Sequence, residues 1–472
     1  MLTEQQLYIA GSWCAGARTR EVRDRWTGDL LATVAVAGAD DARAAVDAAD
    51  AAMRQPFPVA ERSRVLAATA QLVQERGEEL AQSMTAETGK PISNARGEVA
   101  RACETLRYAA EEARRLPGET VPLDASPAGE GTIALTIPEP RGIVAAITPF
   151  NFPLNLLLHK VAPAIAAGCA VVLKPSDSAV LVAGLVTRAF ADAGLPAGRL
   201  NLVTGRPAQT VDVWLEDPRV KVVTFTGSSP VGWGLKARSP EKLHILELGS
   251  NTALVVTDDA DLDRAADAAV LAALSNSGQA CISLQRLYVT PGAADGLLAR
   301  LEERFATIVA GDPHDARTVV GPMITEQATQ SLHGAIVAAA ATGARILAGG
   351  QVVDGVLQPT LLAGVDPTDE LVCHEAFGPV LSVLVVDDLD AAIAAVNSSE
   401  YALNTAIYTA DLATALEFSR RAEAGAALVN MPPSFRADHM PYGGVKGSGQ
   451  GTEGVRYAIH ELVHLKLVVL KG

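Results

Sequence analysis

The chain has 472 residues, of which 49% are hydrophobic and 20% are charged. This is a globular composition, and the length predicts roughly three domains or one large layered architecture. The net charge of −15 disfavours binding to nucleic acid or to an anionic membrane. The apolar runs are shorter than the roughly 18 residues of a membrane helix, and the first residues do not resemble a signal peptide. We therefore expect a cytoplasmic protein without nucleic-acid or membrane partners.

Residues 40–115 have a helical pattern, with apolar residues at intervals of three and four. These helices precede the first clear strand, TIALTIP, which alternates and should be half-buried, with Ile133, Leu135 and Ile137 on one face. The chain ends in a second alternating run, HLKLVVL. Pairing of the two runs, within or between subunits, would cover an exposed edge and predicts a homodimer or homotetramer. A strand that only closes its own sheet would show the same pattern.

From residue 142 onward, short β-branched runs alternate with helical segments. A first group contains GIVAAIT, CAVVLK, RLNLVTG and VKVVTFTG, and a second group starts at NTALVVT. Such alternation predicts βαβ units and parallel sheets covered on both faces. The sequence therefore predicts an α/β fold with two successive α/β domains that meet near residue 249.

The five cysteines are scattered, and no two of them form a C-x-x-C pair. Their odd number and wide spacing argue against a disulfide framework and a zinc ribbon, so no metal site is expected. In a reducing compartment a cysteine is by default a small buried apolar residue. Only one of the five has neighbours that suggest chemistry. The cysteines are Cys14, Cys103, Cys169, Cys281 and Cys373.

Possible nucleotide contacts follow two of the predicted strands, although G-x-G-x-x-G is absent. In FTGSSPVGWG, Gly227 makes a tight turn and Ser228 stands at a predicted helix start, which can hold a pyrophosphate. A purely structural turn explains this run equally well. Lys174 ends the run CAVVLK, and Ser176 and Asp177 follow it, which places them at the carboxyl edge of the sheet, where open α/β sheets bind ligands. A solvated loop would have the same composition.

Three residues are candidates for catalysis. Asn151, in the proline-stiffened loop ITPFNFPLN, could direct its amide N–H at a developing oxyanion, although an Asx turn would use the same residue. Glu247 interrupts the apolar run HILELG, so its carboxylate should be desolvated and its pKa raised, unless it points to water. Cys281, in SGQACISLQR, has small neighbours, and a helix end there could favour the thiolate. A caspase-like interpretation of QAC fails because Ile282 and Ser283 follow.

Taken together and in this order, the segments resemble the NAD(P)-dependent aldehyde dehydrogenase superfamily. The likeness covers almost the whole chain, through YIAGSW, ETGKP, EPRGIVAAITPFNFPL, AAGCAVVLKPSD, VTFTGSSPVG, LELGSN, SGQACISLQR, HEAFGPVLSV, GAALVN and MPYGGVKGSGQGTEG. The absence of G-x-G-x-x-G fits this resemblance, because the family binds its dinucleotide without that motif. The resemblance also implies that the chain has three units. These are a modified Rossmann cofactor domain (1–121 and 141–249), an α/β catalytic domain (250–454) and a small β oligomerisation element (122–140 and 455–472).

The resemblance also implies a mechanism with NAD or NADP as cofactor. Cys281 would attack the aldehyde carbon, and Asn151 with the Cys281 backbone N–H would hold the oxyanion. Hydride would pass to the nicotinamide, and water activated by Glu247 would hydrolyse the resulting thioester. Lys160 matches a supporting lysine near the site. The implied cofactor contacts are Ile147, Thr148, Pro149, Phe150, Lys174, Ser176, Asp177, Gly205, Gly227, Ser228, Leu248, Glu375 and Phe377.

The sequence departs from the family pattern at three places. Asp177 stands where many NAD-preferring members carry Glu, which leaves the choice between NAD and NADP open. Ser250 and Asn251 replace the more usual Gly-Lys. Ala280 replaces an arginine that precedes the cysteine in some members acting on phosphorylated or phosphonate aldehydes.

The runs SFRADHMPYGGVKGSG and CISLQR look most like a subgroup that handles small anionic aldehydes, such as lactaldehyde-like and phosphonoaldehyde substrates. We therefore expect Arg436 to contact the substrate anion, with Arg107 and His159 as weaker candidates. A surface arginine would fit the same context, and Arg286 is expected to be structural. Two alternatives remain: a CoA-acylating enzyme of the same fold, and a non-catalytic oligomer.

Overall fold

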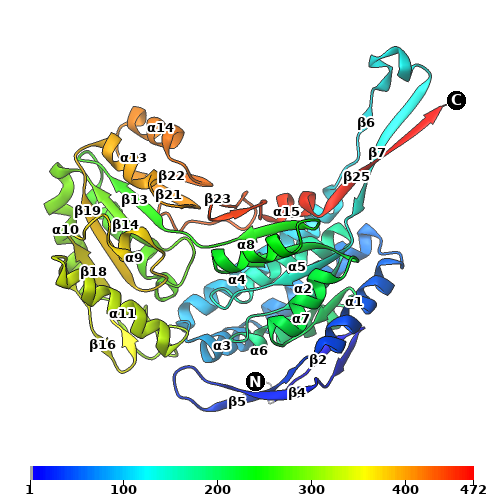
Figure 1. The fold of residues 1–472 in the computed structure, drawn as a ribbon, viewed down its shortest axis with the longest axis horizontal. Coiled ribbons are helices and arrows are strands. Elements are labelled where there is room, and N and C mark those ends of the chain that lie inside the picture. Colours follow the sequence, from blue (N-terminus) through cyan, green and yellow to red (C-terminus); the bar gives the residue numbers. More distant parts are fainter. Residues whose placement is uncertain (1–3, 472) are drawn as a thin grey trace.

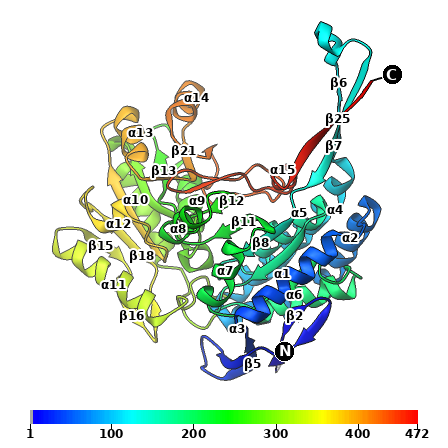
Figure 2. The ribbon, with the colours of Figure 1, turned by 45° about the vertical axis from the view of Figure 1, so that its right-hand side comes forward.

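Two large sheets organise the computed structural model, which describes residues 4–471 (Figure 1). The first sheet has the strand order β24-β12-β11-β8-β9-β10-β2-β3, and the second has the order β15-β18-β19-β14-β13-β21-β22. Helices lie against both sheets, as a second view shows (Figure 2). The predicted α/β fold class is confirmed. Within residues 4–471, no helix is long and apolar enough to cross a membrane.

Five strands precede the first helix, so the prediction that helices come before any clear strand was wrong. The two longest, β4 and β5, pair antiparallel, and β2 with β3 extends the first sheet beyond β10. Most of them have only two or three residues, and β4 and β5 lie in a small separate sheet, so the apolar alternation that marks a strand in the sequence is weak. The strands are β1 (Glu4–Gln5), β2 (Leu7–Ile9), β3 (Ser12–Cys14), β4 (Arg18–Arg23) and β5 (Leu30–Val36).

Four helices follow, as the pattern over residues 40–115 predicts. Their buried faces share apolar clusters with strands of the first sheet. They are α1 (Ala39–Met53), α2 (Val59–Glu75), α3 (Gly77–Thr88) and α4 (Ile92–Glu112).

The central strands of the first sheet are parallel, so their carboxyl ends meet at one edge. The register pairs Ile147 with Lys174, Phe225 with Ile147, and Thr226 with Glu247. Strand ends that are far apart in the sequence thereby become neighbours. The elements are β8 (Ile143–Ile147), α5 (Asn155–Ala167), β9 (Ala170–Lys174), α6 (Val180–Asp192), β10 (Leu200–Leu202), α7 (Pro207–Glu216), β11 (Val220–Thr226), α8 (Ser229–Arg238) and β12 (Leu243–Glu247).

The second sheet is parallel from β18 to β22 and carries its own helices. Its elements are β13 (Thr252–Val256), α9 (Leu262–Leu274), β14 (Leu284–Val289), α10 (Pro291–Phe305), α11 (Glu326–Ala341), β15 (Arg345–Ala348), β16 (Val352–Val353), β17 (Val356–Leu357), β18 (Thr360–Ala363), α12 (Glu370–Cys373), β19 (Val380–Val385), α13 (Leu389–Asn397), β20 (Tyr401–Ala402), β21 (Asn404–Tyr408), α14 (Leu412–Arg421) and β22 (Ala426–Val429).

After β22 the chain returns to the first sheet, through residues 430–454, which we call the return segment (Figure 1). Its strand β24 pairs antiparallel with β12, so that Gly449 lies opposite Glu247. One stretch of chain therefore connects the two sheets at the end of β12. The remaining elements here are β23 (Val445–Lys446), β24 (Gly449–Gln450) and α15 (Val455–Glu461).

A three-stranded sheet projects from the body (Figure 1). The predicted pairing of the two alternating runs is confirmed within one chain, with Val463 opposite Pro140. The prediction that this strand is half-buried was wrong, because Ile133 and Ile137 are exposed in a sheet that extends away from the core. The strands are β6 (Thr120–Val121), β7 (Thr132–Pro140) and β25 (Val463–Lys471).

A buried ion pair joins α4 to the start of α5. Lys90 and Glu98 are paired, and each side chain is at most 1% exposed. The second oxygen of Glu98 accepts the backbone N–H groups of Leu154 and Asn155, each at 2.9 Å. The first N–H groups of a helix lack intrahelical acceptors, and Glu98 supplies one. The Lys90 ammonium also lies 3.9 Å from the centre of the Phe152 ring, so the pair fixes the loop between β8 and α5.

Glu98→Gln should lower the free energy of unfolding by about 3–5 kcal/mol, because it leaves a buried ammonium without a counter-ion. Urea denaturation would measure the change. Glu78→Gln is the matched control, since Glu78 pairs with Arg96 on the surface, where an ion pair contributes little. Equal losses in the two variants would contradict the prediction.

Candidate active site

The three predicted catalytic side chains come from three separate parts of the chain. Asn151 lies in the loop between β8 and α5, and Glu247 is the last residue of β12. Cys281 lies between a short turn, η4 (Ser275–Gly278), and β14. Asn151 and Glu247 are 5% and 3% exposed, and Cys281 is partly buried.

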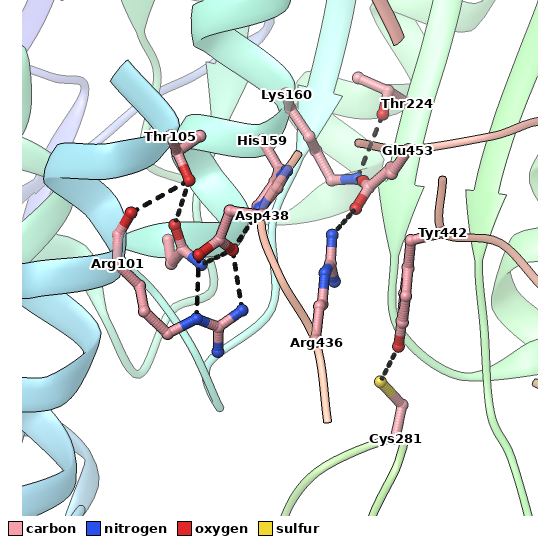
Figure 3. Close-up of polar contacts among 11 residues, drawn as sticks. Arg101, Thr105, His159, Lys160, Thr224, Cys281, Arg436, Asp438, Tyr442 and Glu453 are labelled. Atoms are coloured by element: carbon pink, nitrogen blue, oxygen red, sulfur yellow. Dashed lines mark hydrogen bonds and ion pairs between the residues drawn. The ribbon is translucent and has the colours of Figure 1, made fainter. Parts of the chain in front are cut away.

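The Cys281 sulfur lies 3.1 Å from the hydroxyl of Tyr442, a residue of the return segment (Figure 3). Burial raises the pKa of the Cys281 thiol to about 11; Tyr442 and Arg436 lower it, and the nearby Glu247 carboxylate raises it. The expectation that a helix end favours the thiolate was wrong for the free enzyme. The C-terminal end of α9 precedes Cys281, and that end of a helix disfavours an anion.

Glu247 has the desolvation that its position in the sequence predicts. Both carboxylate oxygens are buried, and neither has a hydrogen-bond partner within residues 4–471. Burial raises its pKa well above the usual range, the charge of Glu453 raises it further, and Arg436 and Lys160 oppose both effects. Such a carboxylate takes up a proton more readily than an exposed one, as a general base must.

Glu453 is the second buried carboxylate of the site, and it holds both neighbouring cations (Figure 3). Lys160 Nζ donates to Glu453 at 2.8 Å and to Thr224 Oγ1 at 3.1 Å. Arg436 Nη2 donates to the other oxygen of Glu453 at 3.1 Å. Burial alone would raise the pKa of Glu453, but Lys160 and Arg436 bring it below its usual value. Glu453 is therefore the stronger acid of the pair that it forms with Glu247.

Arg436 is not a surface arginine, because its side chain is only 5% exposed. Its guanidinium carbon lies 3.7 Å from the centre of the Tyr442 ring, a cation–π contact. Its Nε atom is buried and has no acceptor within residues 4–471. An unpaired buried donor is costly, so this N–H is available to a ligand that brings an acceptor.

Asp438, also in the return segment, gathers side chains from α4 and α5 (Figure 3). It accepts from Arg101 at 2.8 and 3.1 Å and from Asn155 at 2.9 Å, and it lies 2.9 Å from His159 Nε2. Burial would raise the pKa of Asp438, but His159 and Arg101 bring it well below the usual range. Burial and Arg436 lower the pKa of His159. His159 Nε2 is already engaged with the Asp438 carboxylate, so the structure gives His159 a partner other than a substrate anion, and the anion contact expected for it stays a prediction.

The structure does not bring Arg107 to this cluster. Arg107 lies on the exposed face of α4, where it pairs with Glu104 and Gln74. Residues six apart face different sides of a helix, and Arg101 points to the site instead. Arg286, expected to be structural, is buried and donates to the backbone oxygens of Asn251 and Ala395.

Two of the predicted cofactor contacts come from the loop after α12, across from the first sheet. The Phe377 ring lies 6.0 Å from the Phe150 ring, edge to face. Glu375 accepts the backbone N–H of Ser250 at 3.0 Å, and burial raises its pKa to about 7. A Cβ atom on Gly249 would come within 2.8 Å of the Glu375 carboxylate. Any residue other than glycine at position 249 would therefore displace the Glu375 side chain.

A second group of predicted contacts surrounds a cavity of about 230 Å³. Asp177 and Gly205 line it, and Lys174 Nζ lies 3.3 Å from the Asp177 carboxylate. Three arginines that sequence analysis did not select also line this cavity. Their three positive charges outnumber the single negative charge of Asp177. These arginines are Arg18, Arg20 and Arg206.

The other predicted contacts follow the ends of the parallel strands. Ser228 is exposed at the start of α8, and within residues 4–471 its side chain makes no capping bond, which leaves the backbone N–H groups of Ser229 and Val231 uncapped; Pro230 has none. The N–H of Gly227 donates to the backbone oxygen of Glu247 at 3.1 Å. The other members are Ile147, Thr148, Pro149, Ser176 and Leu248.

Sequence analysis missed four residues of the site. Tyr442 and Glu453 lie in the motif MPYGGVKGSGQGTEG, where a lone aromatic and a lone acid among glycines could have singled them out. Arg101 and Asp438 gave no local signal, because 337 positions separate these bonded partners.

Comparison with known proteins identifies the family. The sequence model described as the Aldehyde dehydrogenase family matches residues 13–468. The chain belongs to the aldehyde dehydrogenase family. Over 464 residues it is 40% identical to the 3-sulfolactaldehyde dehydrogenase of Priestia aryabhattai, an alignment that covers 98% of this chain and 97% of that protein. The family resemblance drawn from the motifs is confirmed.

Two solved structures extend the comparison to the aldehyde dehydrogenase fold. The NADP-dependent glyceraldehyde-3-phosphate dehydrogenase of Bacillus halodurans, complexed with NADP, has a TM-score of 0.97, 33% identity and 100% coverage of both chains. Aldehyde dehydrogenase 21 of Physcomitrella patens, in complex with the reaction product succinate, has a TM-score of 0.96 and 35% identity, and covers 100% of this chain and 99% of that one. Enzymes of this fold oxidise aldehydes, and that reaction class applies to this chain.

Tyr442→Phe should raise the pKa of the Cys281 thiol further, because the hydroxyl that lowers it is lost. Less thiolate at a given pH means slower alkylation, by roughly tenfold at pH 9 for one charge-assisted hydrogen bond. Mass spectrometry of the peptide that contains Cys281, after timed exposure to iodoacetamide, would measure the rate. The exposed Cys373 is an internal reference whose rate should not change. An unchanged or faster rate at Cys281 would count against the prediction.

Proposed function

We propose that the protein oxidises a small anionic aldehyde to the carboxylic acid, with NAD or NADP, through a covalent intermediate on Cys281. The observation that carries the proposal is the state of Glu247. This carboxylate has a raised pKa and no hydrogen-bond partner within residues 4–471, and it is close enough to Cys281 to affect the pKa of the thiol. A nucleophile beside a desolvated base suits covalent catalysis that ends in hydrolysis.

In this proposal Cys281 releases its proton to solvent water, and the thiolate attacks the aldehyde carbon to form a thiohemiacetal. Asn151 Nδ2 and the Cys281 backbone N–H have no acceptor within residues 4–471, so both can donate to the new oxyanion. The chemistry that NAD or NADP supplies when bound is hydride acceptance, which leaves Cys281 as a thioester. Glu247 then takes a proton from water as the water attacks the thioester carbon. The acid leaves, and Cys281 recovers its proton.

The residues at the sheet edge fit a dinucleotide. Lys174 and Asp177 would hold the adenosine ribose, and the uncapped N–H groups that follow Ser228 would hold the pyrophosphate. Glu375 and Phe377 would hold the nicotinamide ribose and ring. The three arginines beside Asp177 support acceptance of a 2′-phosphate as well as a 2′-hydroxyl, and the Bacillus halodurans relative binds NADP.

An anionic substrate is supported by the unpaired donor of Arg436 and by two relatives. One relative is named for 3-sulfolactaldehyde, and another holds succinate; both molecules carry a negative group. Arg436 lies beside Tyr442, which contacts the Cys281 sulfur. A short aldehyde on Cys281 would therefore bring its anionic end near the Arg436 Nε.

We further propose a homodimer or homotetramer formed through the projecting sheet, whose exposed apolar side chains support it. The three-unit division of the chain remains part of this proposal, with the projecting sheet as the oligomerisation element. A reducing, cytoplasmic location would keep Cys281 a free thiol. The exposed apolar residues are Ile133, Ile137, Leu465, Leu467, Val469 and Leu470.

Glu247→Gln tests the proposed reaction. The variant should still form one equivalent of reduced cofactor per Cys281 in a rapid burst, because acylation does not use Glu247. Its steady-state kcat should fall by about 10²–10⁴-fold, since the hydrolytic base is gone. Stopped-flow absorbance with neutral, carboxylated and sulfonated aldehydes, with NAD and NADP in turn and without CoA, would measure both phases. Glu241→Gln, on the surface, is the control.

Other outcomes would select the alternatives. Turnover only in the presence of CoA would indicate a CoA-acylating enzyme. No reduced cofactor with any aldehyde, and no change in Cys281→Ser, would indicate a non-catalytic protein.

Arg436→Met should lower kcat/KM for an anionic aldehyde by about 10–100-fold more than for a neutral aldehyde of the same size, the effect of one lost charged hydrogen bond. The ratio of the two substrates cancels general damage to the buried site. Arg107→Ala, on the exposed face of α4, should leave the ratio unchanged. Equal losses for both substrates would remove Arg436 from the substrate site.

A further inference from the structure

Three consecutive residues before Cys281 have a left-handed backbone. The φ angles of Asn276, Ser277 and Gly278 are 54°, 57° and 69°. For residues other than glycine this conformation is strained, by about 1–3 kcal/mol each at strongly disfavoured positions. A turn of this kind persists only when its surroundings fix it. Each of its residues has a different partner outside the turn.

The Asn276 side chain connects two loops. It is 2% exposed, and its Nδ2 atom donates to the backbone oxygen of Asn151 and to that of Gln279, both at 3.1 Å. One planar amide group thus bonds the loop that carries Asn151 and the loop that carries Cys281. Asparagine tolerates the left-handed region better than most residues, so the strain and the contact are satisfied by one side chain.

The other two residues fix the turn to the second half of the molecule. Ser277 Oγ accepts the backbone N–H of Gly321 at 2.9 Å. A Cβ atom on Gly278 would lie 2.1 Å from the backbone oxygen of Gly378, so only glycine fits there. With the turn held on this side, the Asn276 amide sets where the Asn151 loop lies relative to Cys281.

The distance between the two loops matters because of what each contributes. Asn151 Nδ2 and the Cys281 backbone N–H must both reach one oxygen, and a donor that is lost from an oxyanion site costs about 10²–10³-fold in kcat. A displacement of about 1 Å can cost roughly 10²-fold. The Asn151 loop is also held from the far side by the Lys90–Glu98 pair, but in the described part of the chain the side chains of that pair form no hydrogen bond with the Cys281 loop.

We propose that Asn276 is a positioning residue, which holds the Asn151 amide and the Cys281 N–H at the separation that a single oxyanion requires. The proposal rests on the oxyanion role proposed above for Asn151. Asn276 touches neither substrate nor cofactor, and it acts through the backbone of Asn151.

Asn276→Gly tests the proposal, because glycine keeps the left-handed turn and removes only the amide. We expect kcat to fall by about 10–100-fold, with the KM for NAD or NADP unchanged. Asn430→Gly is the matched control: Asn430 also has a left-handed backbone, with φ 53°, and its amide bonds the backbone of Thr409 instead of the Asn151 or Cys281 loop. It should change kcat by less than about threefold. Rates are expressed per reactive Cys281, which iodoacetamide titration counts.

A double-mutant cycle with Asn151→Ala separates positioning from general structural damage. If Asn276 acts through Asn151, then Asn276→Gly should cost less than about threefold in the Asn151→Ala background. Equal costs in both backgrounds would overturn the proposal and leave the function intact. No loss of kcat in Asn151→Ala would overturn the oxyanion role, and this proposal with it.

Asn276→Asp provides a second variant of the same shape, should Asn276→Gly fold poorly. It replaces the shared donor with an oxygen that faces two carbonyl oxygens, and it should lower kcat at least as much. Wild-type kcat in either folded variant would overturn the proposal.

Discussion

Two buried carboxylates, Glu247 and Glu453, lie near two cations, Lys160 and Arg436, and the unequal pairing of these cations with the two acids sets the state of the site. Both cations bond to Glu453, which is ionised. Neither bonds to Glu247, whose pKa is raised. An ionised carboxylate buried without a partner is costly, so the protein keeps Glu247 ready to take a proton.

The return segment creates this inequality. It contributes Glu453 and Arg436 to the charge cluster, and Tyr442 to the Cys281 sulfur. Its β24 strand pairs with the end of β12, so Glu247 cannot move away from them. The Arg436 guanidinium lies on the Tyr442 ring, and the Tyr442 hydroxyl contacts the Cys281 sulfur. One aromatic side chain therefore connects the cation near the proposed base, Glu247, to the proposed nucleophile, Cys281. A single stretch of irregular chain therefore adjusts the protonation of residues from both sheets.

The sequence predicted features that depend on local pattern or on the order of motifs that resemble the family. The α/β class, the pairing of the terminal strand and the desolvation of Glu247 followed from apolar periodicity, because a strand buried on both faces leaves an acid at its end little solvent. The state of the Cys281 thiol did not follow, since it depends on burial in the fold and on the contact with the Tyr442 hydroxyl, which is 161 positions away. The same limit applied to α4, where only the fold shows that Arg101 faces Asp438 and Arg107 faces solvent.

The antiparallel pairing of β24 with β12 also affects how such proteins can recombine. A crossover between relatives that exchanged residues 250–429 would replace the second sheet and Cys281, yet keep the native Tyr442, Arg436 and Glu453 with the native Glu247. A crossover that continued to residue 454 would import a foreign edge strand and foreign counter-ions to the first sheet. The boundary that preserves a working acid–base pair thus lies before the return segment. Chimeric enzymes built on this fold would inherit their proton chemistry from the parent that supplies residues 430–454.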